Sequence, residues 1–145
     1  MNYDEFVTEY HSVSARALQL SKKARGEGLL ALEEMINHEK VKQRDILEYG
    51  LRFVVDGTDA VVIRDILSYI IEQEDDKYTR KLMEIKAETV LSIQAGGSTI
   101  ILAYKLNSFT NLSLEDDPIM REIIKENDEG ALSPDEINAL IGGIQ

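Results

Sequence analysis

The sequence predicts an all-α fold: a helical bundle with one long helix and a short appended helix at the C-terminal end. Three observations carry this prediction. Apolar residues recur at steps of three and four through most of the chain. Glycine, asparagine and capping residues mark the joints between these stretches. The two prolines, Pro118 and Pro134, both lie in the last third, where they cannot interrupt the earlier helices.

Three helices are predicted in the first part of the chain. The first covers residues 4–23 and places one set of apolar side chains on a single face: Phe6, Val7, Tyr10, Val13, Ala17 and Leu18. Gly26 and Gly28 interrupt this pattern, and a shorter helix is expected over residues 29–36. A third helix is expected over residues 43–55, with apolar positions at Ile46, Leu47, Leu51, Val54 and Val55.

The longest helix is predicted to start at residue 60 and to continue into the eighties or nineties. Its first half carries a strong apolar stripe formed by Ile63, Ile66, Leu67, Ile70 and Ile71. Its middle, residues 72–81, is nearly all polar and is interpreted as a solvated face of the same helix. After Gly96 and Gly97, residues 99–112 fit either a last core helix or a strand, because short apolar runs are ambiguous.

The predicted organisation is a bundle over residues 1–112, an acidic linker over 113–131 and an amphipathic tail helix over 132–145. The linker carries one weak helix, capped by Asp117 and started by Pro118. The tail begins with a capping box, in which Ser133 and Glu136 satisfy each other's backbone amides. Its apolar face consists of Ile137, Leu140, Ile141 and Ile144. A helix this short is marginal alone, so its face needs a surface to lie on.

Charge and composition narrow the classes of function. The net charge is −11, and residues 113–145 hold nine acids and two bases, net −7, so nucleic acid is an unfavourable partner. The most apolar window, residues 95–104, is shorter than the roughly 18 residues that a membrane span needs. No signal peptide is visible and there is no cysteine. These features indicate a soluble, cytoplasmic protein.

No constellation of residues predicts an enzyme, a cofactor or a metal. His11 and His38 lie in separate predicted helices, without ligands at metal spacing and without an apparent orienting partner. The glycines at positions 96 and 97 lack the lysine of a phosphate-binding loop. Binding to other proteins is therefore the predicted activity.

The tail resembles the short motif L-S-x-x-E-I-D-A-L-L of the flagellar switch proteins FliM and FliN. The matching residues are Leu132, Ser133, Glu136, Ile137, Ala139 and Leu140, while Asn138 and Ile141 replace aspartate and leucine. The resemblance implies that this segment captures the phosphorylated response regulator CheY. The partner-binding residues it implies are Leu132, Glu136, Ile137, Ala139, Leu140 and Ile141.

Residues 21–94 resemble the cytoplasmic region of the flagellar stator protein MotA. The first matching block is residues 24–34, Ala-Arg-Gly-Glu-Gly-Leu-Leu-Ala-Leu-Glu-Glu, and the second is residues 50–59 with 63–67. In that family this region presents charged residues to the rotor protein FliG. The resemblance implies rotor contacts at Arg25 and Glu33.

Together these features predict a non-enzymatic, protein-binding component of the bacterial flagellar motor or its chemotactic control, located at the motor base. Its expected partners are rotor, switch or stator proteins and phosphorylated CheY. The alternative is a structural homo-oligomer in which the tail helix docks on the body or on a neighbouring copy, and the long helix pairs in a coil.

Overall fold

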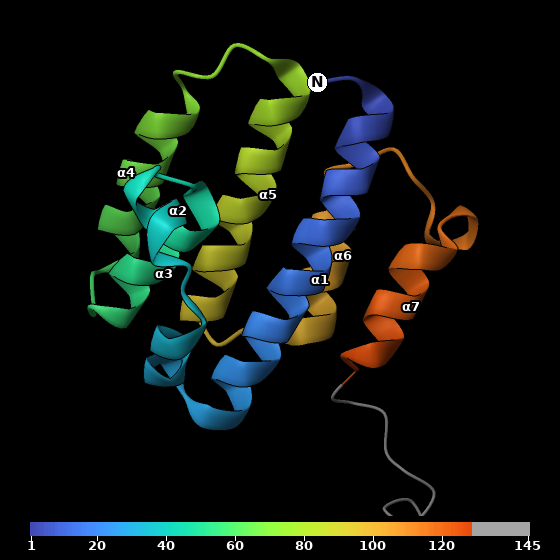
Figure 1. Ribbon diagram of the computed structural model, residues 1–145. Helices are drawn as coiled ribbons and strands as arrows, with labels where there is room; N and C mark the ends of the chain where they lie inside the picture. Colours follow the sequence, from blue (N-terminus) through green and yellow to red (C-terminus); the bar gives the residue numbers. More distant parts are fainter. Residues whose placement is uncertain (129–145) are drawn as a thin grey trace, which may run out of the picture.

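The computed structural model describes residues 1–128, and within them the predicted all-α bundle is confirmed (Figure 1). Helices α1 and α5 run side by side through the middle, with α3 and α4 on one side and α6 and α7 on the other. The elements are α1 (Tyr3–Glu27), the 3-10 helix η1 (Leu29–Met35), α2 (His38–Lys42), α3 (Ile46–Val55), α4 (Ala60–Ile71), α5 (Lys77–Gln94), α6 (Thr99–Asn107), the 3-10 helix η2 (Leu114–Asp116) and α7 (Pro118–Glu126).

Helix α1 is longer than predicted because Gly26 does not end it. The side chain of Asn2 accepts a hydrogen bond from the backbone amide of Glu5, 2.8 Å away, and caps the start. The helix ends one residue before Gly28, which has φ 92° and donates its amide to the carbonyl of Ala24. Glycine adopts this left-handed backbone without a steric penalty, so Gly28 is the true terminator.

The predicted long helix from residue 60 onward is wrong: it is two antiparallel helices, α4 and α5, joined by an acidic turn at residues 72–76. Asp76 starts a new helix, because its carboxylate accepts a hydrogen bond from the backbone amide of Thr79, 2.9 Å away, and caps α5. Arg80 then donates to the carbonyl oxygens of Glu72 and Glu74, which closes the turn. The polar stretch is therefore a hairpin connection.

The predicted third helix, residues 43–55, begins three residues later than expected, and a short helix that was not predicted precedes it. Residues 38–42 form α2, and α3 begins only at Ile46. Between them Arg44 has φ 58°, a left-handed conformation that a continuous helix does not allow. Asp45 accepts the amide of Glu48, 3.1 Å away, and caps α3. Farther along, residues 99–107 resolve the earlier ambiguity as a helix, α6.

The segment predicted as an acidic linker contributes a core helix. Asp117 caps α7 by accepting the amide of Met120, and Pro118 occupies the first turn, as predicted. The side chain of Met120, however, is fully buried against α1 and α6. Residues 118–126 therefore pack as part of the bundle.

Two hydrophobic clusters fill the interior, and both α1 and α5 contribute to each. The first joins the N-terminal halves of α1 and α5 to α6 and α7: Phe6, Tyr10, Val13, Ala17, Leu18, Leu82, Ile85, Leu102, Ala103, Leu106 and Met120. The second joins their C-terminal halves to η1, α3 and α4: Leu20, Leu32, Ile36, Ile46, Leu47, Leu51, Val54, Ile63, Leu67, Val90 and Ile93. The face predicted for α1 is confirmed except at Val7, which is half-buried.

Partly buried ion pairs hold α3 against α1 and α5. The guanidinium of Arg16 on α1 contacts the carboxylate of Glu48 on α3, which is almost fully buried. Lys86 on α5 lies 2.6 Å from the carboxylate of Asp45. Burial alone would raise the pKa of Asp45, but the hydrogen bond and charge of Lys86 outweigh it and hold that pKa below its usual value.

Candidate functional site

The two predicted rotor contacts lie on the surface, and each has partners within its own chain. Arg25, near the end of α1, donates to the carbonyl oxygens of Gly96 and Gly97, 2.8 and 3.1 Å away, at the α5–α6 turn. Glu33, in η1, accepts both of its hydrogen bonds from Arg52 on α3. Both side chains therefore contribute to the local structure of the loops around them.

The other predicted partner-binding residues, Leu132, Glu136, Ile137, Ala139, Leu140 and Ile141, lie outside the described residues. So does the tail helix predicted for residues 132–145. The body nevertheless offers three features that a binding partner could use: an apolar face on α4, an apolar face on α6, and a pocket between the N-terminal segment, α5 and the end of α6.

The outer face of α4 carries several exposed apolar side chains beside the exposed, charged Arg64 and Asp65. Ile63 and Leu67 are buried on its inner side, yet Val61, Val62 and Tyr69 on the outer side are 57, 47 and 61% exposed. A surface helix of a single globular domain normally has a polar outer face. Exposed apolar side chains gathered on one helix are typical of a surface that binds another protein.

Helix α6 shows the same property on a smaller scale. Its inner side is buried through Leu102, Ala103 and Leu106, while Ile101 and Tyr104 on the outer side are about half exposed. Toward its end the helix borders a shallow groove that it shares with α5, lined by Glu88, Lys105, Ser108 and Phe109. The Lys105 ammonium pairs with the Glu88 carboxylate at 3.0 Å across this groove.

A pocket of about 230 Å³ lies where the start of α1 meets the start of α5 and the end of α6. We call it the aromatic–lysine pocket, and its lining residues are Tyr3, Phe6, Lys77, Tyr78, Lys81, Ser108, Phe109, Thr110 and Asn111. Three separate segments supply them, so no local motif in the sequence marks the pocket. The one available signal is the basic run at residues 77–81, which sequence reasoning assigned to a solvated face.

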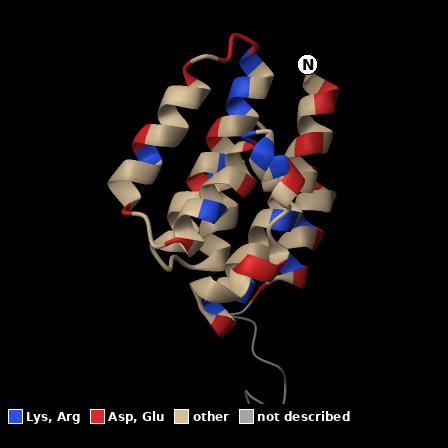
Figure 2. Ribbon diagram, turned by 60° about the vertical axis from the view of Figure 1, so that its left-hand side comes forward, with Lys and Arg blue, Asp and Glu red and all other residues tan. Residues whose placement is uncertain are grey.

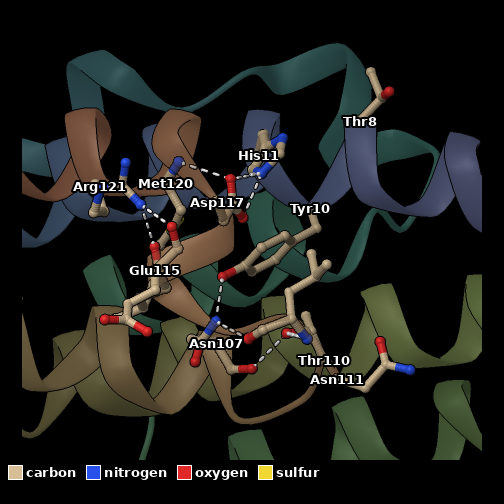
Figure 3. A network of polar contacts seen from close by, with 12 residues as sticks. Thr8, Tyr10, His11, Asn107, Thr110, Asn111, Glu115, Asp117, Met120 and Arg121 are labelled. Carbon is tan, nitrogen blue, oxygen red and sulfur yellow. Dashed lines mark hydrogen bonds and ion pairs between the residues drawn. The ribbon is translucent and has the colours of Figure 1, made fainter.

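His11 has a partner that the sequence did not reveal. Its Nε2 atom lies 2.8 Å from both carboxylate oxygens of Asp117, and both side chains are largely buried (Figure 3). Because Asp117 also caps α7 through the amide of Met120, this contact fastens the start of α7 to α1. The expectation that His11 has no orienting partner is therefore wrong.

Next to this pair, Asn107 connects the end of α6 to α1 and to the following loop. Its side-chain amide donates to the carbonyl of Leu112 at 3.1 Å and to the Tyr10 hydroxyl at 3.4 Å (Figure 3). The hydroxyl of Thr110 donates back to the carbonyl of Asn107 at 2.7 Å. This network fixes the loop that forms one wall of the aromatic–lysine pocket.

Burial raises the pKa of Tyr10 to about 12, and the nearby charge of Asp117 adds to this effect. A phenol whose pKa is raised on folding stabilises the protein fully below its ordinary pKa near 10, and the contribution is lost as the pH rises through 12. Relative to Tyr10→Phe, wild-type stability should therefore fall by about 1 kcal/mol between pH 9 and pH 11. Urea unfolding of both proteins at the two pH values measures this; an unchanged difference would contradict it.

Within residues 1–128, no helix is long and apolar enough to cross a bilayer. The same part of the chain contains no group of three or more His, Cys, Asp or Glu side chains placed to hold a metal ion. Comparison of the chain with models of known protein families, with curated proteins and with solved structures finds no match.

Proposed function

We propose that this chain is a non-enzymatic, protein-binding component of the bacterial flagellar motor or of its chemotactic control. The observation that carries the proposal is the coincidence of two sequence resemblances in one short chain, to the stator cytoplasmic region at residues 21–94 and to the switch-protein motif at residues 130–141. Both families belong to the same machine, so each resemblance supports the other.

In this proposal the helical body is a docking module, and α4 supplies its contact face. The second stator block, residues 50–59 with 63–67, covers the second half of α3 and part of the first two turns of α4. Val61 and Val62, which lie between the two parts of this block, are together with Tyr69 the exposed apolar side chains that a rotor or stator protein would cover. Arg25 and Glu33 would contribute charge at the rim, where exposed ion pairs give specificity more than affinity.

The tail is proposed to bind a second partner, phosphorylated CheY. Ile137, Leu140 and Ile141 are spaced for one apolar helical face, and Glu136 orients the start of that helix. The tail carries no basic residue after Lys125, so its partner's groove should be apolar with a basic rim.

A titration of the isotope-labelled full chain with phosphorylated CheY tests the tail. We expect resonances of residues 131–144 to shift selectively, and Ile137→Asp to abolish the shifts by placing a charge on the apolar face. Asn138→Asp is the matched control, because it adds the same charge away from that face and restores the aspartate of the motif. Shifts spread over the body, or equal shifts in the two variants, would exclude the proposed role of the tail.

The alternative, a structural homo-oligomer, has one observation in its favour. Val62, Ile66 and Tyr69 follow the four- and three-residue steps of a helix-pairing seam on the outer side of α4. The break at residues 72–76 limits any such seam to the 12 residues of α4, far shorter than the coil expected from a continuous helix. Sedimentation decides between the two: a concentration-dependent dimer that Tyr69→Lys abolishes favours the oligomer.

A further inference from the structure

The aromatic–lysine pocket combines aromatic side chains with positive charge. The ring of Tyr78 stacks on Phe6 with centroids 5.2 Å apart, and Tyr3 meets Tyr78 edge-on at 5.9 Å. The Tyr3 hydroxyl donates to the side-chain oxygen of Asn111 at 2.9 Å, which ties the chain start to the loop after α6. These contacts hold the aromatic walls in place, so the pocket is preformed.

Its charge is opposite to that of the whole protein. Lys77 and Lys81 line the pocket, and no acidic residue among residues 1–128 does, in a chain of net charge −11. The ammonium of Lys77 lies 5.4 Å from the centre of the Tyr78 ring. The acid that precedes Lys77, Asp76, has its carboxylate engaged by the N-terminal amine of Met1 and by Thr79.

The surroundings of the pocket are mixed in charge. Figure 2 shows the basic start of α5 next to the acidic α4–α5 turn. On the outer side of α5, the two lysines also border a hollow that contains Asp75, Arg80 and Glu84. On the other side, the pocket shares Ser108 and Phe109 with the groove between α5 and α6, so the two hollows adjoin. We call the pocket and the groove together the trough. This trough suits a peptide segment better than a compact ligand.

We propose that the aromatic–lysine pocket and the adjoining α5–α6 groove hold residues 129–145 of the same molecule. This segment has no lysine or arginine and contains three acids, Glu129, Asp135 and Glu136. It also carries the apolar side chains that an aromatic floor would cover: Leu132, Ile137, Leu140, Ile141 and Ile144. The acidic side chains of the segment complement the lysines of the trough, and its apolar side chains complement the aromatic rings.

The reach of the chain allows this docking. Helix α7 leads away from the pocket, toward the opposite end of the bundle (Figure 1), and its nine residues span about 13 Å. The 17 residues from 129 to 145 extend to about 56 Å when fully stretched. With residues 133–144 helical, that helix measures about 18 Å, and the four residues before it add about 13 Å. The segment can therefore return to the groove and the pocket.

Docking would regulate the proposed function. The apolar side chains held by the body are the same ones offered to a partner, so body and partner compete for them, and the partner's apparent affinity falls by the fraction of tail that is docked. This consequence rests on the proposed function. The docking itself does not, because it involves no second protein.

A spin label tests the docking in the full chain without any partner. Because the chain has no cysteine, Asn138→Cys provides a single attachment site on the polar side of the predicted tail helix. We expect amide signals of Ser108, Phe109, Thr110 and Asn111 to lose most of their intensity, and to regain it when the nitroxide is reduced. Loss confined to α4 or to Ile101 on α6, or no localised loss, would overturn the proposal.

Two charge variants and a mixing experiment sharpen the result. Lys77→Glu/Lys81→Glu should restore the lost intensity, whereas Lys40→Glu/Lys42→Glu, with the same charge change on exposed α2 positions, should not. About 0.5 M salt should weaken docking in the unsubstituted protein, because exposed charges are then screened. An isotope-labelled chain without nitroxide can also be mixed with an unlabelled chain that carries the nitroxide. Loss of amide intensity in the isotope-labelled chain would mean that a second copy supplies the tail, which contradicts docking within one molecule.

Discussion

Replacing Arg16 by methionine is expected to lower the free energy of unfolding by about 3 kcal/mol at neutral pH. The variant leaves the carboxylate of Glu48, whose side chain is 3% exposed, without its cation. Arg16 also donates to the carbonyl of Met35 at 2.6 Å, and that acceptor loses its partner as well. Breaking a buried pair typically costs 3–5 kcal/mol. We expect the low end, because the Arg16 side chain is 32% exposed and water can reach the vacated position.

A matched control removes a cation from an exposed pair. Lys23 contacts Glu27 and Glu34 at 2.9 and 2.8 Å, but these carboxylates are 58 and 70% exposed. Lys23→Met should therefore cost much less stability than Arg16→Met. Chemical denaturation of both variants measures the contrast, and equal losses would show that the burial of Glu48 has no energetic consequence. Arg16→Met/Glu48→Met should recover part of the loss, because it removes the uncompensated charge.

Local periodicity was sufficient to predict that most of the chain is helical and which face of α1 is buried. The face of α1 could be predicted because Phe6, Tyr10, Val13 and Ala17 repeat at helical steps within one uninterrupted stretch. The cap at Asp117 could be predicted for the same reason, since a cap and the amide that it accepts are three residues apart. Information of this kind is contained in a short window of sequence.

The α4–α5 hairpin could not be predicted from periodicity, because the apolar positions of α4 and α5 also fit a single continuous helix. Ile70, Tyr78, Leu82 and Ile85 keep helical steps across the break. The turn is decided by contacts that periodicity does not report: the Asp76 cap, and the Arg80 guanidinium on two carbonyls of the turn. Four acids among residues 72–76 also repel one another in a continuous helix.

The candidate surfaces depend on contacts between distant parts of the chain. His11 and Asp117 are 106 positions apart, and the aromatic–lysine pocket combines residues from three segments. Neither arrangement leaves a spacing that sequence reasoning could detect. The exposure of Val61, Val62 and Tyr69 could not be predicted either, because the sequence of an apolar helix is the same whether another element covers its outer face or not.

Gly50 lies where α3 packs tightly against Val90 of α5, and adding a single methyl group there should destabilise the protein. A Cβ atom on Gly50 would lie 2.6 and 2.9 Å from the two methyl carbons of Val90, distances that require the neighbour to move. Val90 is fully buried and β-branched, so its side chain has little freedom to rotate away. Overpacking of this kind costs about 1–3 kcal/mol, whereas alanine gains only about 1 kcal/mol over glycine in a helix. The clash should therefore dominate in Gly50→Ala.

Two further variants separate the clash from helix propensity. Gly26→Ala adds the same methyl group to α1 at a position with no atom within 4 Å, so it should stabilise the protein by about 0.5–1 kcal/mol. Val90→Ala removes the methyl groups that Gly50→Ala meets, so it should cost less in the Gly50→Ala background than in the wild type, a coupling that a double-mutant cycle measures. If Gly50→Ala were as stabilising as Gly26→Ala, or if the cycle showed no coupling, the close packing of α3 on α5 through Val90 would be wrong. The same methyl group is expected to lower stability at Gly50 and to raise it at Gly26. The difference between the two changes in stability therefore reports the contact of α3 with Val90.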